Sequence, residues 1–529
     1  MEQDNDKGFQ TSVPSPPSSL SSFINQLPLS NPVDGEESEN VLPRDVKARD
    51  PSIFCGACRW LTMLGKELER NYLFGVIVVY GMSQGVGGSL HRVVVEYYWK
   101  DVQIAQPAAV QFYNVIVAIP WNLKPVWGLL TDLVPVAGYH RRPYFILAGF
   151  LGIVSCGGLV LGGKLHVPLA ILLLVAGSAS AAMAEVTIDA VSAKKCREHP
   201  DLASDIQTLC TMSVSIGRLI GFSLSGQAVK AFGPQEAFGL LLIQPILFFI
   251  LAFMLLEPRH PRRLGQIKQI NRSIWPAAKK TWTTLKCPLV WKPTCYTFLS
   301  WAMCPDITEG LFYYYTNPTL GLGFSQEFIG VIFAVGSVLS FLGALIYHKG
   351  LKGLTFRSLL FWAQLFLFLS GMLDLILVTR FNKQLGIPDY FLAAGDESLA
   401  QALYRLKWMP IYILCARLCP AGIEGFFYAL LVAIDLLGLR ASEWGGSVLL
   451  KLTSVTRTNF KFLWVTVLIR NTLRLLPMVL LFLVPNITAD GEVLPSELVG
   501  ASEEIDTDDE NIQLVLQEHP LKAVDKPNL

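Results

Sequence analysis

Two acidic residues lie inside apolar segments of this chain, and the same short pattern surrounds both. Residues 304–313 read CPDITEGLFY and residues 419–428 read CPAGIEGFFY, so Glu309 and Glu424 hold the same place in the pattern. An ionised Asp at the centre of a membrane helix costs about 2.5–3.5 kcal/mol on insertion scales, so an acid there usually faces a cavity and has a function. Both glutamates are therefore candidates for binding a proton or a substrate. The alternative is a chance match, because a long chain offers many windows for comparison.

The surroundings of the two glutamates predict different roles. Arg417 lies seven residues before Glu424, two turns away on the same face if one helix holds both, whereas Glu309 has no basic residue within two turns on its own segment. A lone carboxyl group in hydrocarbon either takes up a proton or pairs with a cation. We therefore expect Glu309 to carry a proton, and Glu424 to stay ionised beside Arg417 and shape a site for an anionic substrate.

A second acidic pair lies in another apolar segment. Glu185 and Asp189 are four residues apart, which places both on one face of a helix. Two neighbouring carboxyl groups at low dielectric can share a proton, as a proton carrier requires. Arg218 is the expected partner of Glu185, although such a pair could be purely structural. Asp189 could instead lie at the membrane interface, because basic residues follow it closely.

A third group has the spacing of a gate. Gly128 and Asp132 precede the basic pair Arg141 and Arg142, and Lys124 lies upstream. A carboxylate at a helix end can bind loop arginines or a facing helix N-terminus, and such a contact breaks when the two halves of a transporter move. In the alternative, the arginines only set the topology and Lys124 only extends its ammonium group to the interface.

The composition indicates that these residues are positioned by membrane helices. The chain is 52% hydrophobic and 16% charged, whereas a soluble globular chain carries about 25% charged residues. A membrane-spanning helix needs about 20 mainly apolar residues. The sequence predicts an all-α polytopic membrane protein with twelve such helices, near 72–90, 108–130, 144–161, 168–190, 206–229, 236–256, 293–315, 327–346, 359–378, 409–437, 444–455 and 461–484.

The charge pattern divides the chain into two halves. Residues 257–292 are basic and rich in proline, as expected of a cytoplasmic linker that can lie on anionic lipid. With both termini inside, the inner segments from residue 41 onward carry 26 Lys and Arg against 10 in the outer loops, which fits the usual inward bias. The predicted parts are a disordered acidic, Ser- and Pro-rich tail with a juxtamembrane segment at 1–71, six-helix bundles at 72–256 and 293–485 on either side of the linker, and an acidic cytoplasmic tail at 486–529.

Four stretches together resemble the folate–biopterin transporter family, a branch of the major facilitator superfamily. They are KPVWGLLTD at 124–132, HRRPY at 140–144, EVTIDAV at 185–191 and CPAGIEGFFYALL at 419–431. The resemblance spans residues 70–485 and implies a central cavity and uptake of folates or pterins together with protons. The residues most like the family's motif residues are Asp132, Arg142, Asp189, Glu309 and Glu424.

The chain departs from the family pattern at four charged residues. Arg218, Asp435, Arg470 and Arg474 stand where uncharged residues are expected. They put the identity of the substrate in doubt more than the fold.

Secondary-active transport of folates or related pterins is the leading interpretation. The alternatives are a carrier of the same fold for another small organic anion, and a non-transporting membrane receptor or scaffold, which would tolerate loss of the intramembrane acids. A P-loop is absent, and all seven histidines are expected in loops or tails, which leaves no basis for an enzyme. We expect no cofactor, metal or nucleic acid; the partners are the substrate, protons and the lipid bilayer. The acidic N-terminus is atypical of transit peptides and favours the plasma membrane over a plastid envelope.

Overall fold

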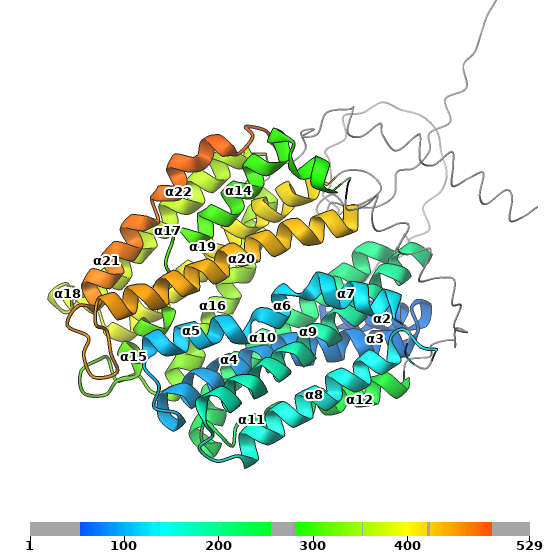
Figure 1. Ribbon diagram of the computed structural model, residues 1–529, viewed down its shortest axis with the longest axis horizontal. Helices are drawn as coiled ribbons and strands as arrows, with labels where there is room; N and C mark the ends of the chain where they lie inside the picture. The colour runs from blue at the N-terminus through cyan, green and yellow to red at the C-terminus, as the bar shows by residue number, and fades with distance from the viewer. Residues whose placement is uncertain are drawn as a thin grey trace, which may run out of the picture.

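The computed structural model describes residues 53–488, apart from 135, 137, 200–201, 255–278, 280, 352 and 420–423. For a few helical residues, Asp132 and Glu424 among them, only the backbone is described. The predicted N-terminal tail up to residue 52, most of the linker and the tail beyond residue 488 lie outside the described residues. All named elements of the described part are helices, and Figure 1 shows them in an N-terminal group below and a C-terminal group above.

The N-terminal group begins with a helix, α2, inside the segment predicted as tail and juxtamembrane. Its elements are α2 (Ile53–Glu67), α3 (Arg70–Val76), η1 (Ile77–Gly87), α4 (Gly88–Tyr97), η2 (Tyr98–Val102), α5 (Pro107–Val117), α6 (Ile119–Asn122), α7 (Lys124–Leu133), α8 (Arg142–Leu161), α9 (Val167–Glu198), α10 (Ala203–Phe232), α11 (Phe238–Leu241) and α12 (Ile243–Met254). Elements α3 to η2 form one long first helix, which extends twelve residues beyond the predicted end at 90.

The C-terminal group begins at Pro288, five residues before the predicted boundary. Its elements are α14 (Pro288–Ala302), α15 (Thr308–Thr316), α16 (Gln326–Ile346), η4 (Tyr347–Leu351), α17 (Phe356–Val378), α18 (Phe381–Gln384), α19 (Asp389–Arg417), α20 (Glu424–Leu452), α21 (Leu463–Leu473), α22 (Leu476–Val479) and η5 (Leu480–Leu483). The seventh predicted helix is thus two pieces, α14 and α15, with a break at residues 303–307 that contains Pro305.

The protein is an integral multi-pass membrane protein. Among the described residues, seven helices are long and apolar enough to cross a membrane, and Phe238–Met254 is a shorter apolar helix. Large apolar side chains remain exposed on these helices, such as Leu172 at 63% and Phe253 at 69%. Surfaces of this kind are stable when lipid covers them.

The prediction for the tenth and eleventh helices, 409–437 and 444–455, is wrong. The chain forms α19 and α20 instead, and the connection between them contains Pro420. Proline lacks a backbone N–H and disfavours helical geometry in the residue before it, so it separates two helices within one apolar run. The part of α19 before residue 409 reads as a polar loop because it carries residues such as Asp396, Arg405 and Lys407, which line the C-side chamber in the structure.

The two copies of the repeated pattern are therefore not equivalent. The first copy begins at the break between α14 and α15, whereas the second spans the connection from α19 to α20. Glu309 thus lies within the interrupted seventh segment, whereas Glu424 begins α20 after a connection between two separate helices.

Glycines allow the first helix to pack closely on α10. A Cβ atom placed on Gly85 would lie 2.7 Å from the Cα atom of Gly217, closer than real Cβ contacts. Only glycine on both helices permits this approach, as expected for membrane helices that pack through small residues.

The two groups of helices meet along α10 and α16 and at the end that holds residues 100–105 and 313–316. Lys100 Nζ donates to the Thr316 carbonyl at 3.0 Å, and the Tyr313 hydroxyl donates to the Ala105 carbonyl at 2.9 Å. Lys230 of α10 also forms an ion pair with Glu327 of α16. Helices α5 and α15 contact one another at this end (Figure 1).

Candidate functional site

A central cavity with three adjoining chambers lies between the two halves. The N-side chamber has a volume of about 420 Å³, the C-side chamber about 390 Å³ and the arginine chamber about 650 Å³. Arg92 of α4 lines all three, so the chambers meet at this residue.

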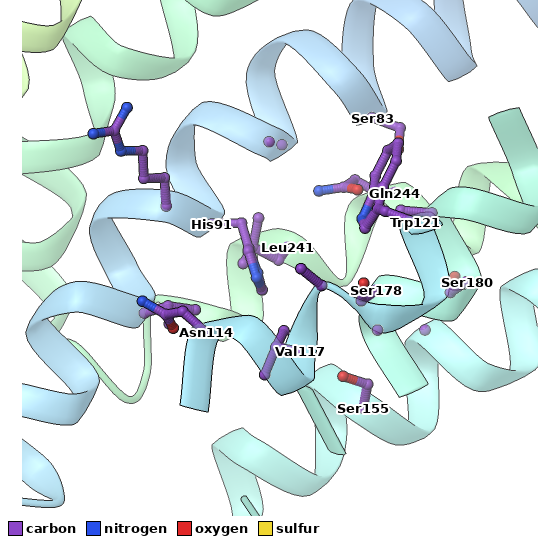
Figure 2. Close-up of a pocket in the computed structure, with 18 of the residues that line it drawn as sticks. Ser83, His91, Asn114, Val117, Trp121, Ser155, Ser178, Ser180, Leu241 and Gln244 are labelled. Atoms are coloured by element: carbon purple, nitrogen blue, oxygen red, sulfur yellow. The ribbon is translucent and has the colours of Figure 1, made fainter. Parts of the chain in front are cut away.

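The N-side chamber is lined by apolar, uncharged polar and charged side chains, most of them from the N-terminal half. Figure 2 shows Ser83 and His91 from the first helix, Asn114 and Trp121 from the second, and Gln244 from α12 around this space. His91 lies on α4, so the expectation that all histidines fall in loops or tails is wrong.

Buried polar atoms in the N-side chamber lack partners. Among the described residues, Ser83 Oγ, Gln84 Nε2 and Ser178 Oγ form no hydrogen bond. Since an unpaired buried polar group costs free energy, such groups are usually explained by an unseen water, an ion or a bound molecule. Their common position on the chamber wall favours a polar guest.

Glu309 lies where the C-terminal half meets this chamber. It is 4% exposed and lies in the first turn of α15, where the helix dipole favours a negative charge. Asn114 Nδ2 donates to its Oε1 atom at 2.8 Å, and its backbone N–H donates to Gln111 Oε1 at 3.2 Å. Its Oε2 atom has no hydrogen-bond partner among the described residues. The predicted proton-carrying group therefore lines a cavity and contacts the opposite half.

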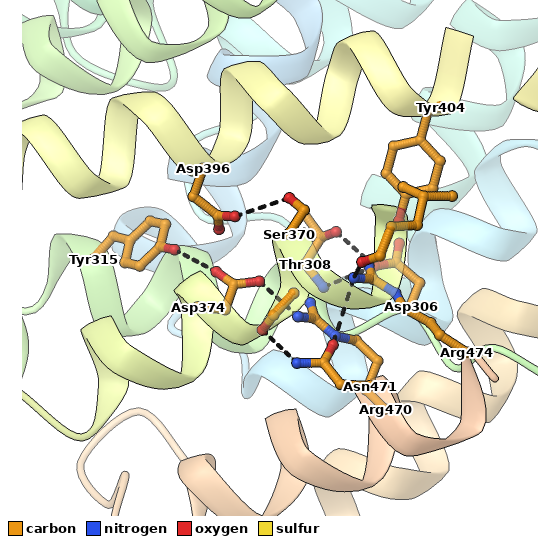
Figure 3. Close-up of polar contacts among 12 residues, drawn as sticks. Asp306, Thr308, Tyr315, Ser370, Asp374, Asp396, Tyr404, Arg470, Asn471 and Arg474 are labelled. Carbon is orange, nitrogen blue, oxygen red and sulfur yellow. Dashed lines mark hydrogen bonds and ion pairs between the residues drawn. The ribbon is translucent and has the colours of Figure 1, made fainter. Parts of the chain in front are cut away.

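The C-side chamber contains a network of buried charges (Figure 3). Arg470 Nη2 donates to Asp374 Oδ2 at 2.6 Å, and the Tyr315 hydroxyl donates to Asp374 Oδ1 at 3.0 Å. Arg474 donates to the Leu367 carbonyl at 3.0 Å and to the Tyr404 hydroxyl at 2.9 Å. Arg470 in α21 and Arg474 directly after it thus connect this end of the chain to α17 and α19.

The signal for this network was present in the sequence. Asp374 is a lone acid in the apolar segment 359–378, and Arg470 is a cation in the apolar segment 461–484. Opposite charges in two membrane segments are expected to pair. The sequence analysis noted the arginine and overlooked the aspartate.

Asp435 and Lys407 are also buried in this half. The Trp301 indole N–H donates to Asp435 Oδ1 at 2.9 Å, and Lys407 Nζ donates to the Ser300 carbonyl at 3.0 Å while lying 3.8 Å from the Trp301 ring centroid. Asp435, which departs from the family pattern, lies within α20 and is 1% exposed.

The arginine chamber takes its name from Arg92, Arg218 and Arg405. They come from α4, α10 and α19, so both halves of the molecule contribute. Arg92 Nε lies 3.4 Å from Glu96 Oε1. For Arg218 and Arg405, no hydrogen bond or ion pair is found among the described residues. Arg218 is exposed, because its side chain borders the cavity.

The predicted pair between Glu185 and Arg218 is wrong. Glu185 Oε2 lies 2.7 Å from Lys124 Nζ, which also lies 4.4 Å from the Trp121 ring centroid. Asp189, one turn along α9, accepts a hydrogen bond from the Tyr80 hydroxyl of the first helix. Lys124 is the first residue of α7, within the second helix. Its ammonium group, and not the Arg218 guanidinium group, pairs with the Glu185 carboxylate of α9.

The predicted pair between Arg417 and Glu424 loses its basis. Arg417 ends α19 and Glu424 begins α20, so the two residues do not share a face of one helix. The side chain of Glu424 lies outside the described residues.

The predicted gate residues lie around the connection from α7 to α8. Arg141 Nη1 donates to Thr131 Oγ1 at 3.2 Å, and Arg142 Nη2 donates to the Phe253 carbonyl at 3.4 Å. A Cβ atom on Gly128 would lie 3.6 Å from Val186 of α9, an ordinary contact. The side chain of Asp132 lies outside the described residues, so the latch between Asp132 and the arginines stays a prediction.

Known proteins resemble this chain in sequence and in fold. The BT1 family model matches residues 84–498. Probable folate-biopterin transporter 2 of Arabidopsis thaliana is 46% identical over 458 residues, which cover 87% of this chain and 91% of that protein. The folate-biopterin transporter of Synechocystis sp. is 32% identical over 422 residues, 78% of this chain and 81% of that protein. The crystal structure of a D-xylose–proton symporter covers 83% of this chain and 100% of its own at 14% identity, with a TM-score of 0.58, so the fold is of the major facilitator type.

Proposed function

Because this chain belongs to the BT1 family and is a membrane transporter, not an enzyme, we propose that it carries folates or related pterins across a membrane by secondary-active transport. Residues 72–256 and 293–485 are proposed as the two moving bundles and residues 257–292 as their cytoplasmic linker. The membrane that we favour is the plasma membrane.

The central cavity is the observation that carries the proposal. Its walls come from both halves, and hydrogen bonds of Lys100 and Tyr313 join the halves. A carrier that works by alternating access needs a site between two rocking halves. Folates and pterins combine a flat polar ring with several hydrogen-bonding groups, which suits walls of amides, hydroxyls and charged residues.

Proton coupling is the second part of the proposal, and Glu309 is the proposed proton-binding group. Asn114 on α5 is its hydrogen-bonding neighbour, while Arg92 and Glu96 on α4 and Asp306 before α15 are the charged groups that act on it. Because its contact crosses between the halves, its protonation would alter a contact that must break during transport. Proton binding at Glu309 would in this way be linked to separation of the two halves.

Uptake of labelled substrate tests the function. The full chain would be reconstituted into liposomes, and accumulation of labelled folate and biopterin would be measured with and without an inwardly directed proton gradient. We expect saturable uptake of at least one compound and accumulation that depends on the gradient. Uptake no faster than in protein-free liposomes would refute transport, and gradient-independent uptake would refute proton coupling.

A further inference from the structure

Among the described residues, the arginine chamber is lined by three cations and no acid, although the same three arginines also border the C-side chamber, which contains acids. Its walls contain Arg92, Arg218 and Arg405, with hydroxyl and amide groups such as Ser337 and Gln401 between them. Cations in a protein interior are normally paired, because an unpaired charge there is costly. Arg92 is paired with Glu96, whereas Arg218 and Arg405 have no ion-pair partner among the described residues, so this chamber suits an anionic guest that completes their pairing.

Guanidinium groups specify the kind of anion. Their planar fork of N–H donors matches the two oxygens of a carboxylate, so an arginine binds this group with geometry as well as charge. Arg218 and Arg405 have no ion-pair partner among the described residues, so their donors are available on the cavity side. Carboxylates are therefore the fitting ligands for this chamber.

The N-side chamber has the opposite polarity. Four acids, Glu96, Asp306, Glu309 and Glu443, line it together with several amides. The Oε2 atoms of Glu96 and Glu309 are buried and have no hydrogen-bond partner among the described residues. An uncharged ring that carries amino and ring N–H donors would satisfy such acceptors, and the Trp121 side chain offers it an aromatic surface.

Arg92 and Glu96 join the two chambers. They lie one turn apart on α4 as an ion pair, and Arg92 borders both spaces. A ligand with a donor-rich ring at one end and carboxylates at the other could extend across this ion pair. Its ring would then lie beside the acids of the N-side chamber, and its carboxylates beside the arginines.

We propose that the cavity sorts its ligand by charge: the N-side chamber binds the amino-substituted ring, and Arg218 and Arg405 bind the carboxylate-bearing tail. The inference rests on the proposed function and deepens it, because it makes these two arginines the determinants that distinguish folates, with their glutamate tail, from tail-less pterins.

Binding of two ligands that differ in the tail tests the proposal. Full-length protein in lipid nanodiscs would be titrated with folate and with biopterin, which lacks carboxylates. Arg218→Gln and Arg405→Gln should each weaken folate binding by about 10-fold or more, the effect of losing one charge-assisted contact, and leave biopterin binding within about 3-fold. Gln244→Leu, in the N-side chamber, should weaken both ligands.

Two control variants keep the test sharp. Lys451→Gln removes a cation from an exposed position at the end of α20, outside the lining of the three chambers, and should change neither ligand. If a glutamine variant does not purify as a monodisperse protein, Arg218→Lys replaces it; this variant keeps the charge but loses the fork, and should weaken folate selectively by a smaller factor.

The outcomes separate this proposal from the function itself. A wild-type protein that binds neither ligand refutes the proposed function, and the inference with it. If wild type binds both but the arginine variants bind folate normally, or lose both ligands equally, the charge-sorting proposal is wrong while the function stands.

Discussion

Asn114 donates a hydrogen bond to Glu309 at 2.8 Å, and this bond connects the two halves of the protein. Asn114 belongs to α5 and Glu309 to α15, 195 residues apart in the chain. A change in the charge of one buried carboxyl group therefore acts directly on the closure of the cavity.

Glu309→Gln should abolish proton-driven accumulation and preserve exchange. The amide resembles the protonated carboxyl group in shape and charge, so the halves can still move but no proton is carried. The measurement compares gradient-driven uptake with exchange of substrate between the two sides of preloaded liposomes. Loss of both activities, or retention of both, would show that Glu309 is not the coupling group. Glu198→Gln, an exposed substitution at the end of α9, is the matched control.

Breaking the ion pair between Asp374 and Arg470 should destabilise the protein strongly. The side chains are only 9% and 5% exposed, and loss of one partner leaves the other charge buried, at a cost of about 3–5 kcal/mol. Asp374→Asn and Arg470→Gln should each lower the melting temperature of the purified protein, and the double variant should recover part of the loss.

A less buried pair offers the comparison for this experiment. Arg380 and Asp389 lie 2.9 Å apart with side chains 32% and 19% exposed, so solvent screens this pair more than the buried one; fully exposed ion pairs contribute about 0.2–1 kcal/mol. Asp389→Asn should therefore lower the melting temperature much less. Equal losses in the two pairs would contradict a special role for burial.

Gly85→Val should disrupt the packing of the first helix on α10. The added side chain would collide with the Gly217 backbone, and overpacking of this kind typically costs about 1–3 kcal/mol or more. Gly157→Val is the control, because no atom outside its own helix lies within 4 Å of a Cβ atom there. Comparable yields of monodisperse protein from both variants would contradict the proposed packing.

A cysteine at Ser273, in the predicted cytoplasmic linker, should resist labelling from outside intact cells. The prediction rests on the excess of basic residues in the inner segments, and Lys164→Cys, in a predicted outer loop, is the positive control. In the structure Arg405 and Lys407 belong to α19 and not to an outer loop, so the excess of basic residues in the inner segments over the outer loops is larger. Rapid labelling at position 273 with an impermeant maleimide would reverse the topology.

The class of fold could be predicted from hydropathy, but hydropathy failed where polar residues line the interior. The seven apolar spans lie close to the predicted segments, because lipid selects for uninterrupted apolar sequence. The first half of α19 escaped prediction because its charged residues face the central cavity, where water and partners replace lipid. Glu309 could be found as an isolated acid, whereas its partner Asn114 is an ordinary amide whose importance depends on tertiary contact.

Pairing between helices was the least predictable feature. Glu185 had two candidate cations, Lys124 and Arg218, and sequence spacing gives no measure of the distance between different helices. In the structure Lys124 Nζ lies 2.7 Å from Glu185 Oε2, and the Arg218 side chain lines the cavity instead.

The break at residues 303–307 changes which parts of the molecule can move as one piece. The Asp306 backbone N–H donates to the Ser442 carbonyl at 3.1 Å, and the Ser442 hydroxyl donates to the Cys304 carbonyl, so the break is held by α20. Thr308 donates to Asp306 Oδ1 through its backbone N–H at 3.0 Å and starts α15 afresh. The nine-residue α15 is thus separated from α14 by a break, and hydrogen bonds hold this break against α20. The segment that carries Glu309 is therefore coupled to α20 through the break as well as to α14 through the chain, so a movement of this segment can reach a helix that is distant in the sequence.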